Sequence, residues 1–265
     1  HDTRAGLDRR RREQPLSSLE SLPGFDGERR SFREALAGPG LSIIAECKAR
    51  SPSKGPLVDE YDPARIAESY ERAGAAAVSV LTEPIHFSGR PEHLAAVRER
   101  VRLPLLRKDF IIDPWQIAEA RAVGADAVLL IAAVLDRPQL SELHAAASEY
   151  GLESLVELYD ARELDRIDFD RVSIAGVNSR DLRTFDVDVD EALRTLDLLP
   201  AGVLRVAESG ISSASTLVRL QDRGVDAALI GEAFMTSADS GGVLERFLEA
   251  LESAQSSSEP GHRGT

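Results

Sequence analysis

An acid and a base lie two residues apart at the end of an apolar run early in the chain. The run Ile43–Ala45 leads directly into Glu46, Cys47 and Lys48. Side chains alternate along a β-strand, so Glu46 and Lys48 are expected on one face and Cys47 on the other. The lack of a polar face before Glu46 is typical of a parallel strand that is covered on both sides. We therefore expect a carboxylate and an ammonium group side by side at the C-terminal end of a buried strand.

A turn-rich loop, Ser51–Gly55, follows this strand. Its hydroxyls, free backbone N–H groups and lysine are suited to holding an anion. The chain has 32 lysine and arginine residues, of which three are lysines: Lys48, Lys54 and Lys108. A desolvated lysine can lose its proton, whereas arginine stays charged. The position of two of the three lysines in this stretch therefore favours a chemical use for them.

Length and composition fit one large α/β domain. The chain has 265 residues and a mass of 28.7 kDa, and 43% of its residues are hydrophobic, which suits a single α/β barrel of about 250 residues. One cysteine leaves no internal disulfide and fits the cytoplasm. An apolar run of about 20 residues and a signal-peptide pattern are both missing, so neither a membrane span nor membrane association is expected.

The net charge of −13 argues against nucleic acid as a partner. An anionic substrate would then need a local positive cluster working against the overall field. The candidates for this cluster are Lys48, Lys54, Lys108 and Arg180.

Residues 1–40 are predicted to form an N-terminal helical extension, with helices over Leu7–Leu22 and Glu28–Leu36. The arginine run Arg9–Arg12 is expected to be a solvated helix face. A breaker cluster at 38–40, Gly-Pro-Gly, marks the boundary to a domain over 41–252. Residues 253–265 are predicted to be a disordered tail.

From residue 41 the pattern strand, loop, helix repeats. Strands are predicted at Leu41–Cys47, Ala77–Thr82, Pro104–Lys108, Ala127–Ile131, Ser154–Leu158, Val172–Val177, Val203–Glu208 and Ala227–Gly231. Helices are predicted at Pro63–Ala73, Pro91–Arg100, Pro114–Val123, Arg137–Tyr150, Ala161–Ile167, Asp190–Leu198, Ser213–Arg223 and Val243–Ala250. Eight alternating pairs predict a (β/α)8 TIM barrel, of class α/β. A doubly wound sheet is the alternative, but G-x-G-x-x-G does not follow the first strand.

In such a barrel the chemistry lies at the C-terminal ends of the strands. Those ends carry Glu46 and Lys48, Thr82 and Glu83, Lys108, Glu157, Asn178 and Arg180, Glu208 and Ser209, and Glu232. The glycine-containing loops after the last two strands, at Gly210 and Gly231, are where barrels commonly hold a phosphate. Glu232 would there offer its N–H and direct its carboxylate away from the anion.

Other chemistries find little support. The five histidines do not show metal-ligand spacing, so no metal site is expected. Cys47 is expected to face the helix layer, where it belongs to the core.

Motifs on separate strands resemble one family. The segments AECKARSPSKG, LLRKDFIID, SLVELYD, AGVNSRDL, VAESGI and LIGEAFM are together similar to indole-3-glycerol-phosphate synthase of tryptophan biosynthesis, from about Pro15 to Leu251. The resemblance implies a (β/α)8 barrel that uses no cofactor. It implies a phosphorylated small-molecule substrate, 1-(2-carboxyphenylamino)-1-deoxyribulose 5-phosphate, which is cyclised with loss of CO2 and water. Other tryptophan-pathway enzymes are the partners it suggests.

The resemblance also implies roles for individual residues. Lys108 would be the general acid for ring closure, and Lys48 would contact the anthranilate carboxylate or the alkoxide, or serve as the acid in dehydration. Glu157 would act as a base or stabilise a cationic intermediate. Glu46 would tune and position both lysines.

The remaining positions implied by the resemblance fall into three groups. Asn178, Glu208 and Ser209 would orient the substrate and complete a polar wall. The phosphate would be held by Ser51, Lys54, Gly210, Gly231 and Glu232. The aromatic ring would lie in a pocket formed by Pro52, Phe87, Phe110, Leu129, Arg180, Leu182 and Ile230.

Two competing interpretations remain. A barrel like phosphoribosylanthranilate isomerase would need a cysteine and an aspartate at two strand ends, but Cys47 is expected to face outward. A non-catalytic scaffold of the pathway would predict eroded site residues, yet the polar positions are intact.

Overall fold

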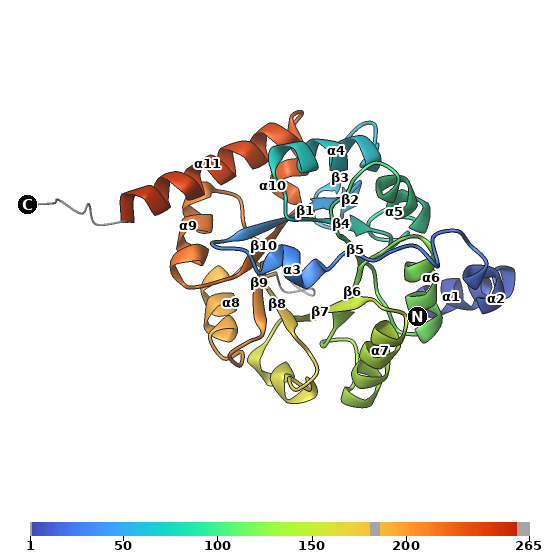
Figure 1. Ribbon diagram of the computed structural model, residues 1–265. Coiled ribbons are helices and arrows are strands. Elements are labelled where there is room, and N and C mark those ends of the chain that lie inside the picture. The colour runs from blue at the N-terminus through green and yellow to red at the C-terminus, as the bar shows by residue number, and fades with distance from the viewer. Residues whose placement is uncertain (1, 181–185, 259–265) are drawn as a thin grey trace, which may run out of the picture.

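Eight parallel strands close into a barrel in the computed structural model, which describes residues 2–180 and 186–258. The strands are β1 (Ser42–Cys47), β4 (Ala77–Leu81), β5 (Leu105–Lys108), β6 (Ala127–Ile131), β7 (Glu153–Leu158), β8 (Ile174–Asn178), β9 (Leu204–Glu208) and β10 (Ala227–Ile230). Each strand pairs with its neighbours in chain order, and β1 pairs with both β4 and β10 (Figure 1). The predicted (β/α)8 barrel is confirmed.

Helices cover the outside of the barrel. They are α4 (Pro63–Ala73), α5 (Pro91–Arg98), α6 (Pro114–Ala122), α7 (Arg137–Glu149), α8 (Val189–Leu196), α9 (Ala214–Asp222), α10 (Glu232–Met235) and α11 (Ser240–Ser258). Asp62, Asp113 and Asp136 cap α4, α6 and α7 by accepting backbone N–H bonds, and a proline follows each cap or comes one residue later. Among these described helices, none is long and apolar enough to cross a membrane.

Two elements predicted for the part of the chain after residue 41 differ in the structure. Segment 161–167 forms a single 3-10 helix, η1 (Ala161–Arg166), in which none of the residues is buried, so no apolar face holds a full α-helix there. Helix α11 continues to Ser258 and so includes the start of the predicted disordered tail. Leu251 anchors α11, and the Ser253 and Ser256 hydroxyls donate back to carbonyls one turn earlier.

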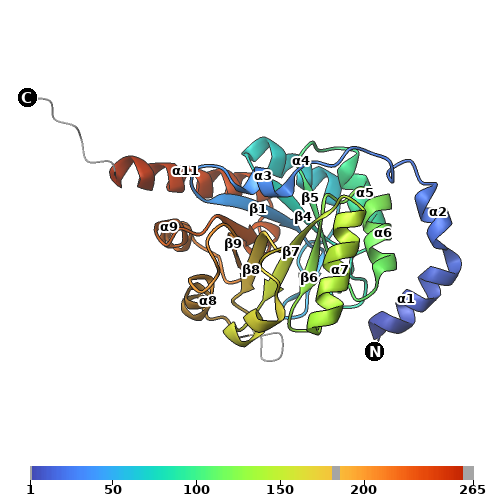
Figure 2. The ribbon, with the colours of Figure 1, turned by 60° about the horizontal axis from the view of Figure 1, so that its bottom comes forward.

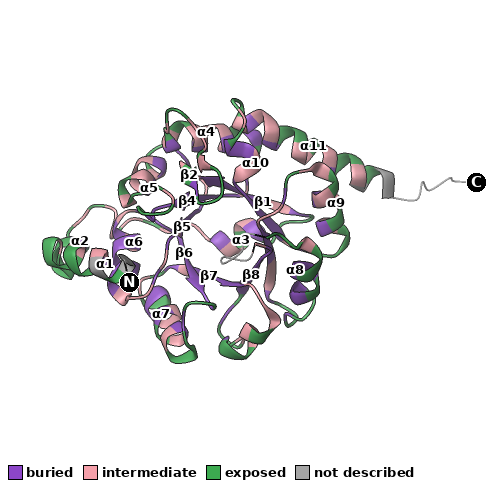
Figure 3. Cartoon of the chain, turned by 180° about the vertical axis from the view of Figure 1, so that it is seen from behind, coloured by how far each residue is buried: buried purple, intermediate pink, exposed green. Residues whose placement is uncertain are grey.

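Strand alternation divides the core into two parts. Side chains such as Ile43, Ala45 and Cys47 face the helices, while Ile44 faces the barrel interior. Figure 3 shows the strands as the buried centre of the molecule. The interior cluster is filled by apolar residues, among them Leu106, Leu129, Leu155, Val206 and Leu229. The interior is therefore a packed core, and the chemistry is confined to its rim.

The extension contributes α1 (Asp2–Glu13), α2 (Leu16–Glu20) and α3 (Phe32–Leu36). The single helix predicted over Leu7–Leu22 is therefore wrong, because the chain is extended at Pro15 and a second helix begins after it. The helix predicted over Glu28–Leu36 begins only at Phe32. Helix α3 lies across the end of the barrel where the strands begin (Figure 1). Its Phe32 and Leu36 are fully buried and pack with residues that open strands, such as Ala77 and Ala227. Helix α3 therefore closes the barrel at the end opposite the strand termini that carry the chemistry.

Helices α1 and α2 lie along the outside, beside α6 (Figure 2). Arg10 forms an ion pair with Glu119 at 2.9 Å, and Arg11 with Asp113 at 2.7 Å. The expectation of a solvated helix face is correct for Arg9, Arg11 and Arg12, which are exposed, but Arg10 is half-buried, and Arg10 and Arg11 pair with carboxylates at α6. A small apolar cluster that includes Trp115 completes the contact.

Candidate active site

The polar residues at the strand ends stand directly above interior apolar residues. Leu106 precedes Lys108 by two positions, Leu155 precedes Glu157, and Val206 precedes Glu208. Since side chains two residues apart share a face, these groups project into the mouth of the barrel. Ile44 and Glu46 follow the same rule, so alternation alone gathers charges from four strands.

Lys108 lies among three carboxylates. Its Nζ is 2.9 Å from Glu208 Oε2, 3.4 Å from Glu46 Oε2 and 3.9 Å from Glu157 Oε2. Burial disfavours the ammonium ion, but Glu208, Glu46 and Glu157 outweigh this effect and raise the pKa of Lys108. Lys108 is therefore a protonated group whose side chain is 15% exposed and lies against the cavity.

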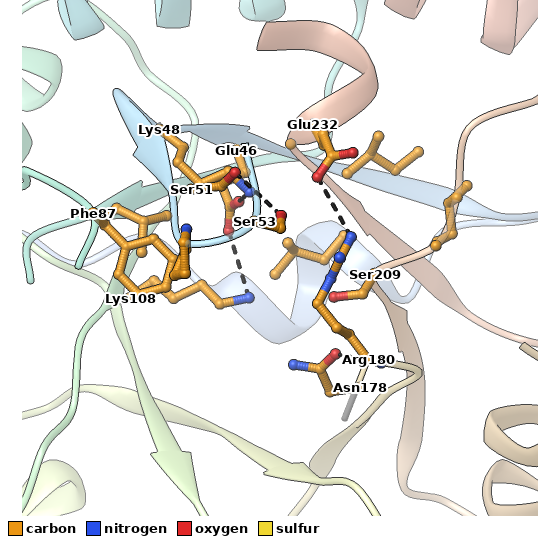
Figure 4. A pocket seen from close by; sticks show the side chains of 17 residues that line it. Glu46, Lys48, Ser51, Ser53, Phe87, Lys108, Asn178, Arg180, Ser209 and Glu232 are labelled. Atoms are coloured by element: carbon orange, nitrogen blue, oxygen red, sulfur yellow. Dashed lines mark hydrogen bonds and ion pairs between the residues drawn. The ribbon is translucent and has the colours of Figure 1, made fainter. Parts of the chain in front are cut away.

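Lys48 and Glu46 form the pair expected from their spacing, with 2.9 Å between Lys48 Nζ and Glu46 Oε1 (Figure 4). Burial of Glu46 raises its pKa, but Lys48 and then Lys108 more than compensate, so the pKa of Glu46 is lowered overall. Glu46 thus remains ionised and bridges the two lysines. Cys47, on the opposite face, is fully buried, and burial raises the pKa of its thiol.

Glu157 differs from the other carboxyl groups. Burial and the neighbouring Glu208 carboxylate raise the pKa of Glu157 well above its ordinary value, although Lys108 and a hydrogen bond from Asn178 oppose the shift. Glu157 Oε2 and Glu208 Oε1 are both buried and lack a hydrogen-bond partner among the described residues. Glu157 thus lies beside a second buried carboxyl group, which disfavours its ionised form.

Two glycines make room for this cluster. A methyl group on Gly176 would lie 2.2 Å from Glu208 Oε1, and one on Gly231 would lie 2.4 Å from Glu46 Oε1. Neither backbone position has a positive φ, so the requirement for glycine comes from the neighbouring carboxylate. Gly176 was not predicted as a site residue. Nothing in the sequence shows that a glycine inside β8 lies against the side chain of Glu208 on the next strand, β9.

A cavity of about 810 Å³, including the part open to solvent, lies over these groups, within the range of about 300–1,000 Å³ found for small-molecule sites. Predicted residues that line it are Glu46, Lys48, Ser51, Pro52, Phe87, Lys108, Asn178, Arg180, Ser209, Gly210, Ile230, Gly231 and Glu232. Ser53, Leu81, Ile211 and Leu229 also line it and were not predicted. Each is a direct neighbour of a predicted residue or a strand terminus, so the same strand-end rule applied more broadly would have included them.

One end of the cavity is basic. Lys54 Nζ lies 2.7 Å from Glu232 Oε1, and Arg180 Nη2 lies 3.4 Å from Glu232 Oε2. The expectation that Glu232 directs its carboxylate away from this place is wrong, because two cations attract it (Figure 4). Burial alone would raise the pKa of Glu232. Lys54 and, to a smaller extent, Arg180 lower it by more than this, so the pKa of Glu232 is lowered overall.

The opposite side carries Phe87. Two residues predicted for the ring pocket do not line the cavity. Leu129 lies one interior layer deeper than Ile131 on β6, and Phe110 packs against the interior cluster and edge-on to the ring of His86, 6.4 Å away. Leu182 lies outside the described residues.

The described part of the chain has no group of three or more histidine, cysteine or acidic residues placed to hold a metal ion. The site instead offers ammonium and carboxyl groups, in different protonation states, around a cavity that is basic at one end and aromatic at the other. Such an arrangement can carry out general acid–base chemistry on an anionic substrate.

Comparison with known proteins identifies the family. The model of a family described as indole-3-glycerol phosphate synthase matches residues 1–247, which extends the predicted likeness toward the N-terminus. A protein of that name from Salinibacter ruber is 56% identical over 247 residues, covering 92% of each chain. Indole-3-glycerol phosphate synthase 2 of Streptomyces coelicolor is 45% identical over 237 residues, covering 89% of this chain and 92% of the relative.

Similar solved structures show the fold alone. One is 3-hexulose-6-phosphate synthase from Salmonella typhimurium, with a TM-score of 0.64 and 14% identity over 81% of this chain and all of the other. KGPDC from Streptococcus mutans has a TM-score of 0.62 and 14% identity, over 82% of this chain and 99% of the other. Together, the family match over residues 1–247 and the identity to the named relatives show that the chain belongs to the indole-3-glycerol phosphate synthase family of carboxy-lyases.

Proposed function

We propose that Lys108 is the general acid of the family's reaction. In this reaction a ring carbon of 1-(2-carboxyphenylamino)-1-deoxyribulose 5-phosphate attacks the ribulose carbonyl, and CO2 and water are lost to give indole-3-glycerol phosphate. The developing alkoxide needs a proton. The observation that carries the proposal is the Lys108 ammonium in the mouth of the barrel, kept protonated by three carboxylates. It holds its proton until an oxygen basic enough to take it forms.

Glu157 is the base that we propose for the later loss of a proton. A carboxyl group is a useful base near neutral pH when its pKa lies well above the ordinary value, as the pKa of Glu157 does. Glu208 supports both groups, since it pairs with Lys108 and raises the pKa of Glu157. Asn178 donates to Glu157 and so orients it.

Lys48 is proposed to bind the substrate carboxylate before it leaves as CO2. Lys48 lines the cavity, and its ammonium group forms an ion pair with Glu46, which uses one of its three donors. Glu46 pairs with both lysines, at 2.9 Å from Lys48 and 3.4 Å from Lys108, and so holds them beside one another. Ser209 completes the polar wall beside Asn178.

The phosphate is proposed to lie at the basic end. Lys54 and Arg180 supply charge, and Gly210, Gly231, Glu232 and Ser51, which line the cavity, would add backbone N–H groups and a hydroxyl. The phosphate would replace the Glu232 carboxylate as the counter-ion of Lys54 and Arg180. The aromatic ring then lies toward Phe87 and Pro52.

We also propose a cytoplasmic location and, as partners, enzymes that supply the substrate or use the product. The single cysteine, buried and unpaired, supports a reducing compartment.

The test is a fluorescence assay for the indole product, run on the wild type and on Lys108→Ala and Lys108→Arg. We expect kcat to fall by several orders of magnitude in Lys108→Ala. Lys108→Arg keeps the positive charge but holds its proton more tightly, so its kcat should also be very low. A Lys108→Ala variant with kcat within tenfold of the wild type would overturn the assignment. Absence of turnover in a folded wild-type protein would favour the scaffold interpretation.

A further inference from the structure

The loop after β4 has little apolar packing of its own. Pro84, Ile85, His86 and Ser88 are exposed, and Ile85 is 48% exposed. Phe87 is half-buried and lines the cavity. A surface loop with so few buried apolar groups needs another source of order to hold an aromatic ring in one place.

Glu83 supplies that order. Its side chain is buried, at 3% exposure, and no cation is paired with it among residues 2–180 and 186–258. Its carboxylate instead accepts three backbone N–H groups of the loop: Ile85 at 3.0 Å, His86 at 2.7 Å and Phe87 at 3.2 Å. Hydrogen bonds from N–H groups to a carboxylate are stronger than bonds between neutral groups. These three bonds can therefore order the loop although it has little apolar packing.

The backbone of Glu83 also fixes the far end of the loop. Its carbonyl accepts the N–H of Gly89 at 2.8 Å. A methyl group on Gly89 would lie 2.4 Å from the Leu81 carbonyl oxygen, and Ser88 takes a positive φ of 55°. The loop therefore folds back tightly onto the end of β4, with the Glu83 carboxylate at its centre.

The strand end that carries Glu83 is itself fastened to the catalytic strand. Thr82 donates its backbone N–H to the carbonyl of Lys108 at 3.0 Å, and its hydroxyl donates to Asp109 at 2.7 Å. Figure 4 shows Phe87 on the same side of the cavity as Lys48 and Lys108. A fixed Glu83 thus relates the position of the Phe87 ring to that of the proposed general acid.

We propose that Glu83 is a positioning residue that sets the place of Phe87 and with it the width of the slot for the substrate's aromatic ring. Glu83 does not line the cavity and acts only through the loop. The inference rests on the proposed placement of that ring against Phe87.

The test is a double-mutant cycle on kcat/KM with Glu83→Gln, Phe87→Ala and the combination. Glutamine keeps the size of the side chain but has one acceptor oxygen and no charge. We expect each single variant to raise KM about tenfold, with kcat within about threefold, because chemistry at Lys108 is untouched. The kcat/KM of the combined variant should be less than about twofold below that of Phe87→Ala, because the effects of two residues that act through one another are not additive.

The controls separate the possible failures. Glu99→Gln, an exposed carboxylate after α5, should match the wild type, and Glu83→Asp, which keeps the charge, should recover part of the loss. If the two single effects multiply in the combined variant, the inference is overturned. If Phe87→Ala alone keeps the wild-type KM, the proposed ring placement fails instead. A Glu83→Gln variant with unchanged KM, beside an impaired Phe87→Ala, would also overturn the inference.

Discussion

Gly176 offers a sharp test of the geometry of the site. It lies on β8 and touches neither Lys108 nor the cavity wall, yet an added Cβ would lie 2.2 Å from Glu208 Oε1 and 3.2 Å from Glu208 Cδ. Its φ is not in the left-handed region, so alanine is compatible with the backbone. The change Gly176→Ala therefore introduces one severe collision, with the carboxylate that binds Lys108, and a tight contact of 3.3 Å with Leu155 Cδ1.

The size of the effect follows from the distances. A Cβ contact of 2.2 Å is about 1.2 Å short of the 3.4 Å at which ordinary van der Waals contact begins. Glu208 must move by about that amount, which breaks its 2.9 Å contact with Lys108 Nζ. A displacement of about 1 Å among catalytic groups costs on the order of 100-fold in rate. We expect kcat to fall about 10- to 100-fold and stability to fall by about 1–3 kcal/mol, as for other overpacked sites.

The assay measures indole product by fluorescence, with thermal melting to confirm the fold. Gly38→Ala is the matched control, because its nearest neighbour would lie 4.0 Å away and its φ is not in the left-handed region. A Gly176→Ala protein with wild-type kcat and a wild-type melting temperature would refute the argument that Glu208 is held in place by the space above Gly176.

Three further predictions concern other parts of the site. Lys54→Ala should raise KM at least tenfold with little change in kcat, because it removes one cation of the proposed phosphate site; an unchanged KM would contradict that role. Glu157 has a raised pKa in the folded protein, so its contribution to stability is complete below 4.5 and is lost as pH rises through its folded pKa. The melting temperature of Glu157→Gln should therefore fall further below that of the wild type at pH 5 than at pH 8. An equal difference in melting temperature at the two pH values would contradict this. Arg107→Met leaves the buried Asp109 without its cation and Glu119 with Arg10 alone, and should cost about 3–5 kcal/mol in urea unfolding; a loss as small as that of an exposed arginine variant would disprove it.

Sequence reasoning predicted the rim of the barrel well because one rule governs it. Alternation along a strand and the common direction of parallel strands are enough to bring Glu46, Lys108, Glu157 and Glu208 together. The pairing of Lys48 with Glu46 follows from their spacing alone. None of this required knowledge of how individual side chains choose their rotamers.

The rest depends on contacts that no local pattern encodes. The side chain of Glu232 turns toward Lys54 because the fold places two cations beside it. The resemblance does not fix depth, so Leu129 was expected in the ring pocket although it packs one layer below the rim. The role of Gly176 depends on a carboxylate 32 positions later, at 208, and only a closed barrel makes them neighbours.

Closure of the barrel also determines the order in which the chain can mature during synthesis. Ser42 on β1 pairs with Ala227 on β10, so the first strand lacks one of its neighbours until 185 more residues (227 − 42) have been made. At about 5–20 residues per second this delay lasts roughly 10–40 s. During that time one edge of β1 and the inner faces of the growing sheet are open to unwanted pairing. Early docking of Phe32 and Leu36 on the strand starts would shield part of that surface. The N-terminal extension would then protect the growing chain during synthesis as well as close the finished barrel.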